Sequence, residues 1–454
     1  MRSKRGGERK VDLGAVTEIL SEHLSSDLIQ ATFEEGRRGE RERALTLEMM
    51  VRFWTAVILR APASLSRALR EATGGTPGFY PLVGVSRQAF FQRCAELNWE
   101  FFAEVFRAFV QRLASIEPPR FARQHADVAR RFEGLCVLDG SNLDPVARRL
   151  KVLWPDGRRP VPGKILACYD LVRGTLAELL YSPSLRTSEV TMAREVLERL
   201  EPGVLFIADR LYGTAQFLAD VQKMGHWGVF RDQGWAHIAL GDCHERTTYD
   251  GARLEDWDVV LGKAARLRPR LVRLRRKGKT YDFITNVLDR DHLSAREVAE
   301  LYASRWTVER VFYDLKEVLN LHCFYCGTAN AVAMQVYAAV IVHTAMRVAQ
   351  GRIAEEAEVE PEALSPAKLF PLLAATFSTY AGMELGFAST QIANPGVKLN
   401  KPDWRDHCAF TTTLDQIRAD KSREKRKRGK KPTGKERSAW RDLPPPPGRA
   451  DERA

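Results

Sequence analysis

Hydrophobic positions in the first quarter of the chain recur with the period of amphipathic helices. Apolar side chains follow this period in Leu45–Leu59 and in Phe90–Leu113. A glycine-rich break at residues 74–78 separates two helical groups, and Ser86 stands where an N-cap is expected. We therefore expect residues 1–125 to form a helical N-terminal domain. Two interpretations of it stay open: a plain helical bundle, or a group that binds DNA in the manner of a helix-turn-helix.

From about residue 130 the pattern changes to short apolar runs that alternate with helices. Two β-rich runs joined by Arg173-Gly174 predict a hairpin. The expected elements, strands except where noted, are Leu135–Leu138, Lys164–Val172, Thr175–Ser182, Ser188–Leu200 (helix), Val204–Ala208, Thr214–Met224 (helix) and Trp227–Phe230. This order predicts an α/β core with a partly parallel sheet. Residues 232–291 read as a β-rich insertion, strongly basic between Lys263 and Lys279.

Helices return at residue 294, and the last part of the chain becomes polar and basic. The apolar run Ala329–Ala349 contains Gln335, His343 and Arg347, which favours a buried helix over a membrane span. We expect helices in 351–415 and a disordered tail in 416–454. The net charge is +12, and from Lys421 onwards 13 Lys and Arg face 5 Asp and Glu. Such a tail is typical of proteins that bind a polyanion; a solvated end without a partner is the alternative.

The seven cysteines are dispersed and odd in number, which does not fit a secreted disulfide framework. No apolar signal stretch follows the basic N-terminus. We therefore expect a reduced, cytoplasmic protein. Cys323 and Cys326 have the spacing of half a zinc site, but no second pair follows at a suitable distance. The glycines form no phosphate-binding loop of the Walker type, so use of ATP is not indicated.

The strongest local signal lies in one predicted helix. Ser294 and Glu297 form a capping box, and Val298–Asn320 contains neither proline nor glycine. Four polar residues fall within an arc of roughly 60° on it: Tyr302, Arg305, Glu309 and Lys316. The apolar positions expected to face the core are Leu301, Val308, Phe312, Leu315 and Leu319. A carboxylate between two cations suits a metal ligand flanked by phosphate-binding groups, whereas a plain Arg305–Glu309 ion pair is the alternative.

Asp139 and Asp209 each stand where an apolar run ends. Two buried strands would deliver both carboxylates to the C-terminal edge of the sheet, where ligand sites of α/β proteins lie. Together with Glu309 they would form an oxygen-rich cage of the kind that magnesium prefers. Two such ions activate water on one side of a scissile bond and stabilise the leaving oxygen on the other. A turn or helix-cap role for each Asp is the alternative.

These residues carry a resemblance to a known family. Tyr302-x2-Arg305-x3-Glu309-x6-Lys316 resembles the Tyr-Arg-Glu-Lys signature of DDE transposases in the group named after insertion sequence four. Asp139 in Val-Leu-Asp-Gly-Ser resembles the first catalytic Asp of that family, and Asp209 in Ile-Ala-Asp-Arg-Leu-Tyr resembles the second. The resemblance covers about residues 130–350, and the β-rich stretch lies where this group carries an insertion.

The resemblance implies an RNase H-like catalytic domain at 130–350 and a cut-and-paste reaction with two Mg²⁺ or Mn²⁺ ions. The implied catalytic and metal-binding residues are Asp139, Asp209 and Glu309, and the implied DNA contacts are Tyr302, Arg305, Lys316 and Arg210. The implied partners are double-stranded DNA, as terminal inverted repeats and target, and a second copy of the chain in the DNA complex. No membrane is expected, and a bacterial cytoplasmic location, on the nucleoid when bound to DNA, follows.

Some relatives form a DNA hairpin and hold a flipped base with an aromatic residue of the insertion, for which Trp235 and Trp257 are candidates in this chain. Two alternatives to a transposase stay open. One is a domesticated relative that binds DNA without catalysis, and the other is a nuclease without strand transfer.

Overall fold

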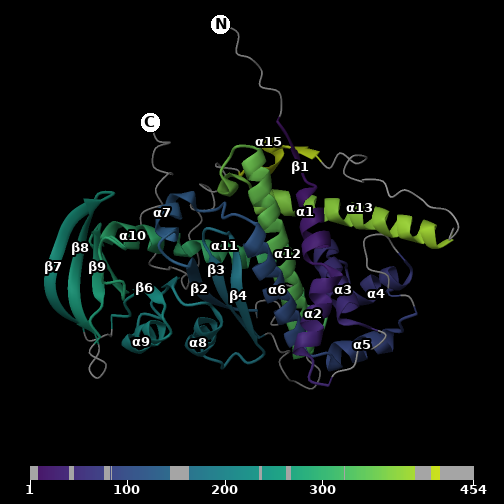
Figure 1. Cartoon of the computed structure of the whole chain (residues 1–454), viewed down its shortest axis with the longest axis horizontal. Coiled ribbons are helices and arrows are strands. Elements are labelled where there is room, and N and C mark those ends of the chain that lie inside the picture. The colour runs from purple at the N-terminus through teal and green to yellow at the C-terminus, as the bar shows by residue number, and fades with distance from the viewer. Residues whose placement is uncertain are drawn as a thin grey trace, which may run out of the picture. The chain divides into compact units, whose positions relative to one another are not determined.

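The computed structural model describes residues 9–39, 45–75, 82, 84–143, 163–234, 238–261, 267–321, 323–393 and 411–419. The chain divides into two compact units (Figure 1). The sheet unit contains residues 122–141 and 164–311. The helical unit contains the described residues up to 121, residues 142, 143 and 163, and the described residues from 312 onwards. The domain predicted at 130–350 is thus divided, because residues from 312 pack with the N-terminal helices.

A nine-stranded mixed sheet forms the centre of the sheet unit, in the order β4-β3-β2-β5-β6-β10-β9-β8-β7. Its strands are β2 Gly134–Asn142, β3 Lys164–Asp170, β4 Thr175–Ser182, β5 Val204–Ala208, β6 Trp227–Arg231, β7 Ile238–Tyr249, β8 Ala252–Leu261, β9 Arg270–Arg276 and β10 Lys279–Thr285. Strands β2, β5 and β6 are parallel neighbours, and β3 and β4 form the expected hairpin. The partly parallel sheet expected from the sequence is therefore present.

The four strands β7–β10 occupy the stretch predicted as a β-rich insertion. Each pairs antiparallel with the next. Strand β10 also pairs antiparallel with β6, with Ile284 opposite Phe230. The insertion therefore extends the central sheet instead of forming a sheet of its own. Local patterning could not predict this, because the β6–β10 pairing joins segments about 50 residues apart in the chain.

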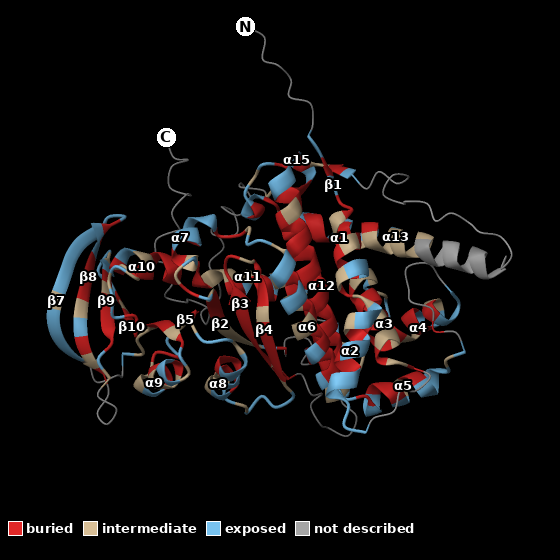
Figure 2. Ribbon diagram, in the orientation of Figure 1, coloured by how far each residue is buried: buried red, intermediate tan, exposed pale blue. Residues whose placement is uncertain are grey.

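Helices α8 (Glu189–Arg199) and α9 (Ala215–Lys223) pack against the parallel strands. Met192 and Val196 of α8 share a core with Leu138 and Phe206, and Figure 2 shows this interior as a continuous buried region. Full burial of each such side chain contributes about 1.5–3 kcal/mol. This packing fixes the part of β2 that carries Asp139 and the end of β5 that leads into Asp209.

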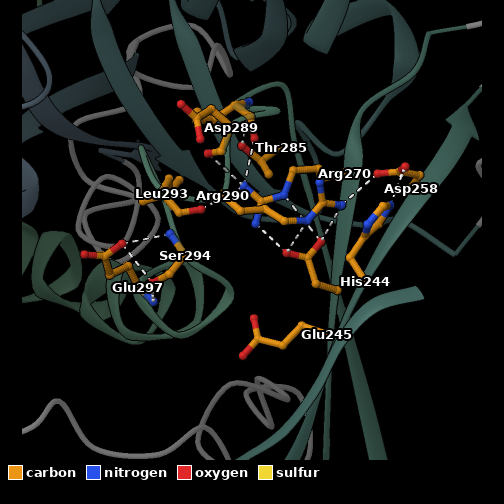
Figure 3. A network of polar contacts seen from close by, with 12 residues as sticks. His244, Glu245, Asp258, Arg270, Thr285, Asp289, Arg290, Leu293, Ser294 and Glu297 are labelled. Atoms are coloured by element: carbon orange, nitrogen blue, oxygen red, sulfur yellow. Dashed lines mark hydrogen bonds and ion pairs between the residues drawn. The ribbon is translucent and has the colours of Figure 1, made fainter. Parts of the chain in front are cut away.

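A buried arginine ties the insertion to the helix that follows it. Arg270 and Asp256 are 1% and 0% exposed, and their Nη2 and Oδ2 atoms lie 2.5 Å apart. Arg270 Nη1 also donates to the carbonyl oxygens of Val287 at 3.0 Å and Leu293 at 2.7 Å (Figure 3). Burying a charge this deeply is costly unless it is paired and hydrogen-bonded, and both conditions are met at this place. The loop that leads into α10 is thereby held in one conformation.

The helix that carries the predicted signature is continuous in the chain but not uniform. It begins as α10 (Ala295–Ala303), with the predicted capping box of Ser294 and Glu297 formed. A 3-10 turn follows at Ser304–Trp306, then α11 (Thr307–Tyr313), and then a π turn at Asp314–Val318.

The single regular helix expected for Val298–Asn320 is therefore wrong in detail. The amide of Ser304 donates to carbonyls three and four residues back, while that of Leu319 donates five back, to Asp314. These shifts change the angle at which side chains project. All five apolar positions expected to face the core are buried nonetheless.

The described part of the helical unit is built mainly from helices, which range from a single turn to 28 residues. They are α1 Ala15–Glu18, α2 Ser26–Gly36, α3 Leu47–Arg60, α4 Leu65–Thr73, α5 Arg87–Glu96, α6 Glu100–Ile116, α12 Ala329–Glu356 and α13 Pro366–Ala393. Ser86 caps α5 as expected, accepting from the amide of Ala89. Helix α12 is long and apolar enough to cross a membrane, but its most apolar stretch is entirely buried, as in a core helix.

Two short strands interrupt the segments predicted as helical. β1 (Lys10–Asp12) pairs antiparallel with β11 (Thr411–Thr413), which precedes the short helix α15 (Leu414–Ile417). Three-residue strands leave too little pattern to be recognised locally. The first residues of the predicted disordered tail, 416 and 417, are helical in α15. Residues from 420 onwards lie outside the described part of the chain.

Replacing Arg270 by Met is expected to lower the free energy of unfolding by about 3–5 kcal/mol, because Asp256 would stay buried with only the more distant Arg290, 3.4 Å away, as its charge partner. Urea denaturation of Arg270→Met measures this. The control is Arg130→Met, whose side chain is 73% exposed and pairs with an exposed Asp127. Its expected cost is below about 1 kcal/mol. Equal costs for the two variants would show that the Arg270 network does not anchor the loop.

Candidate active site

Strand pairing brings Asp139 and Asp209 together. In the parallel β2–β5 ladder, Leu138 lies opposite Ala208. Asp139 is the next residue of β2, and Asp209 directly follows β5. Neighbouring strands lie about 4.8 Å apart, so the two residues lie side by side where the β2–β5 pairing ends. The expected adjacency is therefore present, but β2 continues to Asn142, so Asp139 lies within its strand and not at the strand end.

A third residue in this row, Arg231, was missed by the sequence analysis. Ala208 of β5 lies opposite Phe230 of β6, which places Arg231 beside Asp209. The Arg231 guanidinium stands 5.2 Å from the centre of the Tyr281 ring, in cation–π contact. The sequence does contain a signal for Arg231, because the apolar run Trp227–Phe230 is followed by a charged residue, as are the runs before Asp139 and Asp209.

Arg305 joins the first and third predicted acidic residues. Its Nη1 lies 3.3 Å from Oδ2 of Asp139, and its Nη2 lies 3.5 Å from Oε1 of Glu309. The Arg305 side chain is 5% exposed, whereas that of Glu309 is 43% exposed. The plain ion pair considered as an alternative for Arg305 and Glu309 is therefore formed, and the same guanidinium also holds Asp139.

Tyr302 lies deeper than predicted. The resemblance implied a DNA contact for Tyr302, but its side chain is 2% exposed and its ring centre lies 4.5 Å from that of Phe283. Burial raises the pKa of Tyr302 to about 12, against the lowering effect of Arg305 and Arg231 nearby. The cause of the deeper position is β10, which carries Phe283 over the helix. Tyr302 supports the Arg305 guanidinium through a side-chain hydrogen bond.

The remaining predicted contacts lie in different surroundings. Arg210 is exposed, directly after Asp209. Lys316 belongs to the helical unit, where its Nζ donates to the carbonyl oxygen of Asn142 at 3.2 Å, and burial lowers its pKa. Trp257 is half-buried and in cation–π contact with Arg246 at 5.5 Å. Trp235 lies outside the described residues.

The Asp139 carboxyl has a raised pKa. Burial first, and the charges of Asp209 and Glu309 after it, raise this pKa to about 7 against the lowering effect of Arg305 and the Gly140 amide. The Arg305 guanidinium therefore does not offset burial and the two neighbouring carboxylates. Proton loss from Asp139 near neutral pH requires additional positive charge in its surroundings.

The donor chemistry of the three carboxylates fits a hard divalent cation. Burial is the main cause of the raised pKa of Asp139, and the charges of Asp209 and Glu309 add to it, so a divalent cation beside these carboxylates would favour the ionised form. As the side chains stand, no three His, Cys, Asp or Glu residues in the described part of the chain are grouped closely enough to hold a metal ion. Arg305 is the cation found between Asp139 and Glu309.

Comparison with known proteins gives a consistent result. Residues 154–345 match the family model described as "Transposase DDE domain", a range that includes Asp209 and Glu309 and begins after Asp139. A probable transposase for insertion sequence element IS5377 from Geobacillus stearothermophilus is 36% identical over 70 residues, 15% of this chain and 18% of that protein. These matches support a DDE transposase.

Two further proteins are similar to this chain. A putative transposase, y4zB, from Sinorhizobium fredii is 34% identical over 80 residues, 18% of this chain and 22% of that protein. The chain is thus aligned with only about a fifth of each of these relatives. A cryo-EM structure of a piggyBac transposase synaptic complex with hairpin DNA covers 87% of both chains, at 10% identity and a TM-score of 0.37. A likeness this low carries no argument about the fold.

Replacing Asp139 by Asn is expected to stabilise the protein at pH 8 in the presence of a chelator. The folded-state pKa of about 7 exceeds the ordinary 3.8, so between about pH 4 and pH 7 the folded protein binds more protons than the unfolded chain. The free energy of unfolding therefore falls as pH rises through this window. Asn imitates the neutral form, and the expected gain at pH 8 is roughly 2–4 kcal/mol.

Thermal unfolding at pH 4 and pH 8 measures this effect, with the exposed Asp127→Asn as the matched control. The gain should vanish at pH 4, where Asp139 is protonated in the folded state. A wild-type protein as stable as Asp139→Asn at pH 8 would mean that Asp139 carries no excess negative charge.

Proposed function

We propose that this protein is a DDE transposase of the insertion-sequence-four group, which cleaves DNA at the ends of a mobile element and joins the 3′ ends to target DNA. The observation that carries the proposal is the side-by-side placement of Asp139 in β2 and Asp209 directly after β5, with Glu309 linked to Asp139 through Arg305. Three carboxylates from two strands and one helix give a DNA-binding protein without catalysis no advantage, because DNA is itself a polyanion.

In this proposal Asp139, Asp209 and Glu309 hold two Mg²⁺ or Mn²⁺ ions. Bound there, the metal ions would supply an activated water or 3′ hydroxyl and stabilise the leaving oxygen. Within an RNase H-like core, β2 and β5 keep the first two carboxylates in fixed register, while the more exposed Glu309 has room to adjust. Arg305 provides the positive charge among them when no cation is bound.

Three arginines are suited to hold DNA phosphates around this edge. Arg210 is exposed next to Asp209, and Arg231 lies beside Asp209 on β6. Arg305 is hydrogen-bonded to the Tyr302 side chain. Guanidinium groups bind phosphate oxygens in a bidentate manner, which positions a DNA strand without reading its sequence. Lys316 is proposed as a further phosphate contact on the resemblance alone.

The wider setting follows from the same proposal. The partners are the terminal inverted repeats of the element and the target DNA, bound by a homodimer. Helices of the first 125 residues are proposed to contact the element ends, and the basic tail to add contacts with the DNA backbone. The location is the bacterial cytoplasm, on the nucleoid when DNA is bound.

Changing Asp139 or Asp209 to Asn, or Glu309 to Gln, is expected to reduce cleavage of an element-end DNA by more than about 1,000-fold while DNA affinity changes little. Each variant removes one charge without changing side-chain size. The measurement is cleavage of labelled DNA with Mg²⁺, alongside binding by gel shift. Asp127→Asn, an exposed change of the same kind in the sheet unit, is the control and should cut normally.

The outcomes separate the alternatives. Cleavage that survives in any of the three variants would remove that residue from the active site. A wild-type protein that binds the DNA but never cuts it would favour the non-catalytic relative. A pre-cut end with a free 3′ hydroxyl, supplied together with target DNA, tests strand transfer; cutting without joining would indicate a nuclease.

Changing the exposed Arg210 to Gln should weaken DNA binding and make the slope of log affinity against log salt concentration about one unit less negative. The physical reason is the loss of one phosphate contact and of the counterions that it releases. Binding measured from low to moderate salt gives the slope, and Arg130→Gln, an exposed change outside the row, serves as the control. A slope equal to that of the wild type would exclude a phosphate contact by Arg210.

A further inference from the structure

A buried histidine outside the predicted set of site residues contacts the helix that carries Arg305. His125 is the last residue of a 3-10 turn, Arg123–His125, in the sheet unit. It is 1% exposed, and its Nε2 lies 2.8 Å from Oγ of Ser304, which is 4% exposed. Ser304 directly precedes Arg305. The contact therefore connects the start of the sheet unit with a residue next to the acidic site.

A second hydrogen bond shows where the protons of this contact lie. The Ser304 hydroxyl donates to the carbonyl oxygen of Glu300 at 3.3 Å, so its oxygen accepts from Nε2–H of His125. Burial lowers the pKa of His125 to about 4, against the raising effect of the Glu297 charge. The imidazole is therefore neutral at neutral pH, and the single ring proton is the one that it donates to Ser304.

The contact lies at the place where the signature helix changes its winding. Helix α10 ends at Ala303, and the 3-10 turn Ser304–Trp306 follows. A 3-10 turn rotates by about 120° per residue against about 100° in an α-helix, so three such residues redirect the side chains after them by about 60°. A serine hydroxyl bonded to the carbonyl four residues back also favours a bend. The direction of the Arg305 guanidinium thus depends on this turn.

The segment that carries His125 also holds the beginning of α10. Arg131 pairs with Glu297 of the capping box, and both side chains are about one quarter exposed. Arg131 Nη1 donates to the carbonyl oxygen of His292 at 2.7 Å as well. Helix α10 is therefore attached to one short segment at its first turn, through Arg131, and directly after its last residue, through His125. Attachment at both ends limits how far the helix can shift or rotate.

A buried histidine that only completes the core is the competing explanation. His226 in the same unit is of this kind: it is 2% exposed, and its Nε2 lies 2.9 Å from the carbonyl oxygen of Leu197 in α8. The two histidines thus have similar burial and one ring hydrogen bond each at a similar distance. They differ in what that bond reaches, because only His125 contacts the turn that carries Arg305.

We propose that His125 is a positioning residue of the acidic site: its hydrogen bond to Ser304 holds the 3-10 turn so that the Arg305 guanidinium lies between Asp139 and Glu309. His125 itself contacts neither DNA nor metal in this proposal and acts through Arg305. The inference rests on the proposed function, because it assigns His125 an effect on DNA cleavage at that site.

The test measures the cleavage rate of the full-length protein at saturating element-end DNA with Mg²⁺, and DNA affinity by gel shift. His125→Leu is expected to lower the rate about tenfold and to change affinity by less than about twofold, because a displaced guanidinium impairs the reaction more than binding. His125→Gln, whose side-chain amide still donates, should recover most of the rate.

Changes at Ser304 test the other partner of the bond. Ser304→Ala should lose as much rate as His125→Leu, and Ser304→Thr, which keeps the hydroxyl, should not. His226→Leu is the matched control and should cut as fast as the wild type. A normal rate in both His125→Leu and Ser304→Ala would overturn the inference, and so would an equal loss in His226→Leu.

A double mutant shows whether His125 acts through Arg305. Arg305→Lys keeps the positive charge but loses the two-nitrogen fork that contacts Asp139 and Glu309. Without that fork, adding His125→Leu should slow cleavage by less than about twofold more. Losses that multiply in the double mutant would mark an independent structural effect of His125 and reject the positioning role.

Hydrogen exchange supplies a readout without DNA. The amides of residues 304–309 should exchange faster in Ser304→Ala and His125→Leu than in the wild type, and unchanged in His226→Leu, because the turn loses its attachment. Equal exchange in all four proteins would contradict the proposal. Thermal unfolding shows whether each variant is folded, and if His125→Leu is not, Ser304→Ala decides.

The design separates this inference from the proposed function. A wild-type protein that never cuts DNA rejects the proposed function, and the role of His125 in cleavage with it. A wild-type protein that cuts, together with His125→Leu and Ser304→Ala variants that cut equally well, rejects only the positioning role.

Discussion

The parallel pairing of β2 with β5 is the constraint from which the candidate site follows. Because Leu138 lies opposite Ala208, the residues that follow them, Asp139 and Asp209, must lie side by side. Two carboxylates held side by side on neighbouring strands repel each other and lose hydration, so positive charge at that place stabilises them. Arg305 supplies such a charge, but burial still raises the pKa of Asp139 to about 7.

The helix that supplies Arg305 and Glu309 is positioned from a distance by the insertion. Arg270 holds Asp256 of β8 and the carbonyl oxygens before α10 in one buried network. The Ser294 capping box then begins the helix at a fixed point. Strand β10 continues the sheet next to β6 and places Phe283 against Tyr302, which supports Arg305. The four strands of the insertion therefore help to position the side chains of the site.

Much of the local structure could be predicted, since each element carries its own pattern. The β3–β4 hairpin, α8, β5, α9 and β6 lie within a few residues of their expected bounds, and the Ser86 and Ser294 caps are formed. The errors have one cause in common. The buried position of Tyr302, the uneven helix after Ala303 and the β1–β11 pairing all depend on contacts with segments distant in the chain.

The sequence by itself determined which residues carry charge at the strand ends and along the signature helix, because periodicity and capping act over a few residues. Only the tertiary structure decided what surrounds them. Arg231 joins the row through the β5–β6 register, and the Glu189 side chain lies against β2 because position 140 is glycine. Strand register and close backbone approach are set by packing between distant segments, so neither leaves a local pattern from which these neighbours could be inferred.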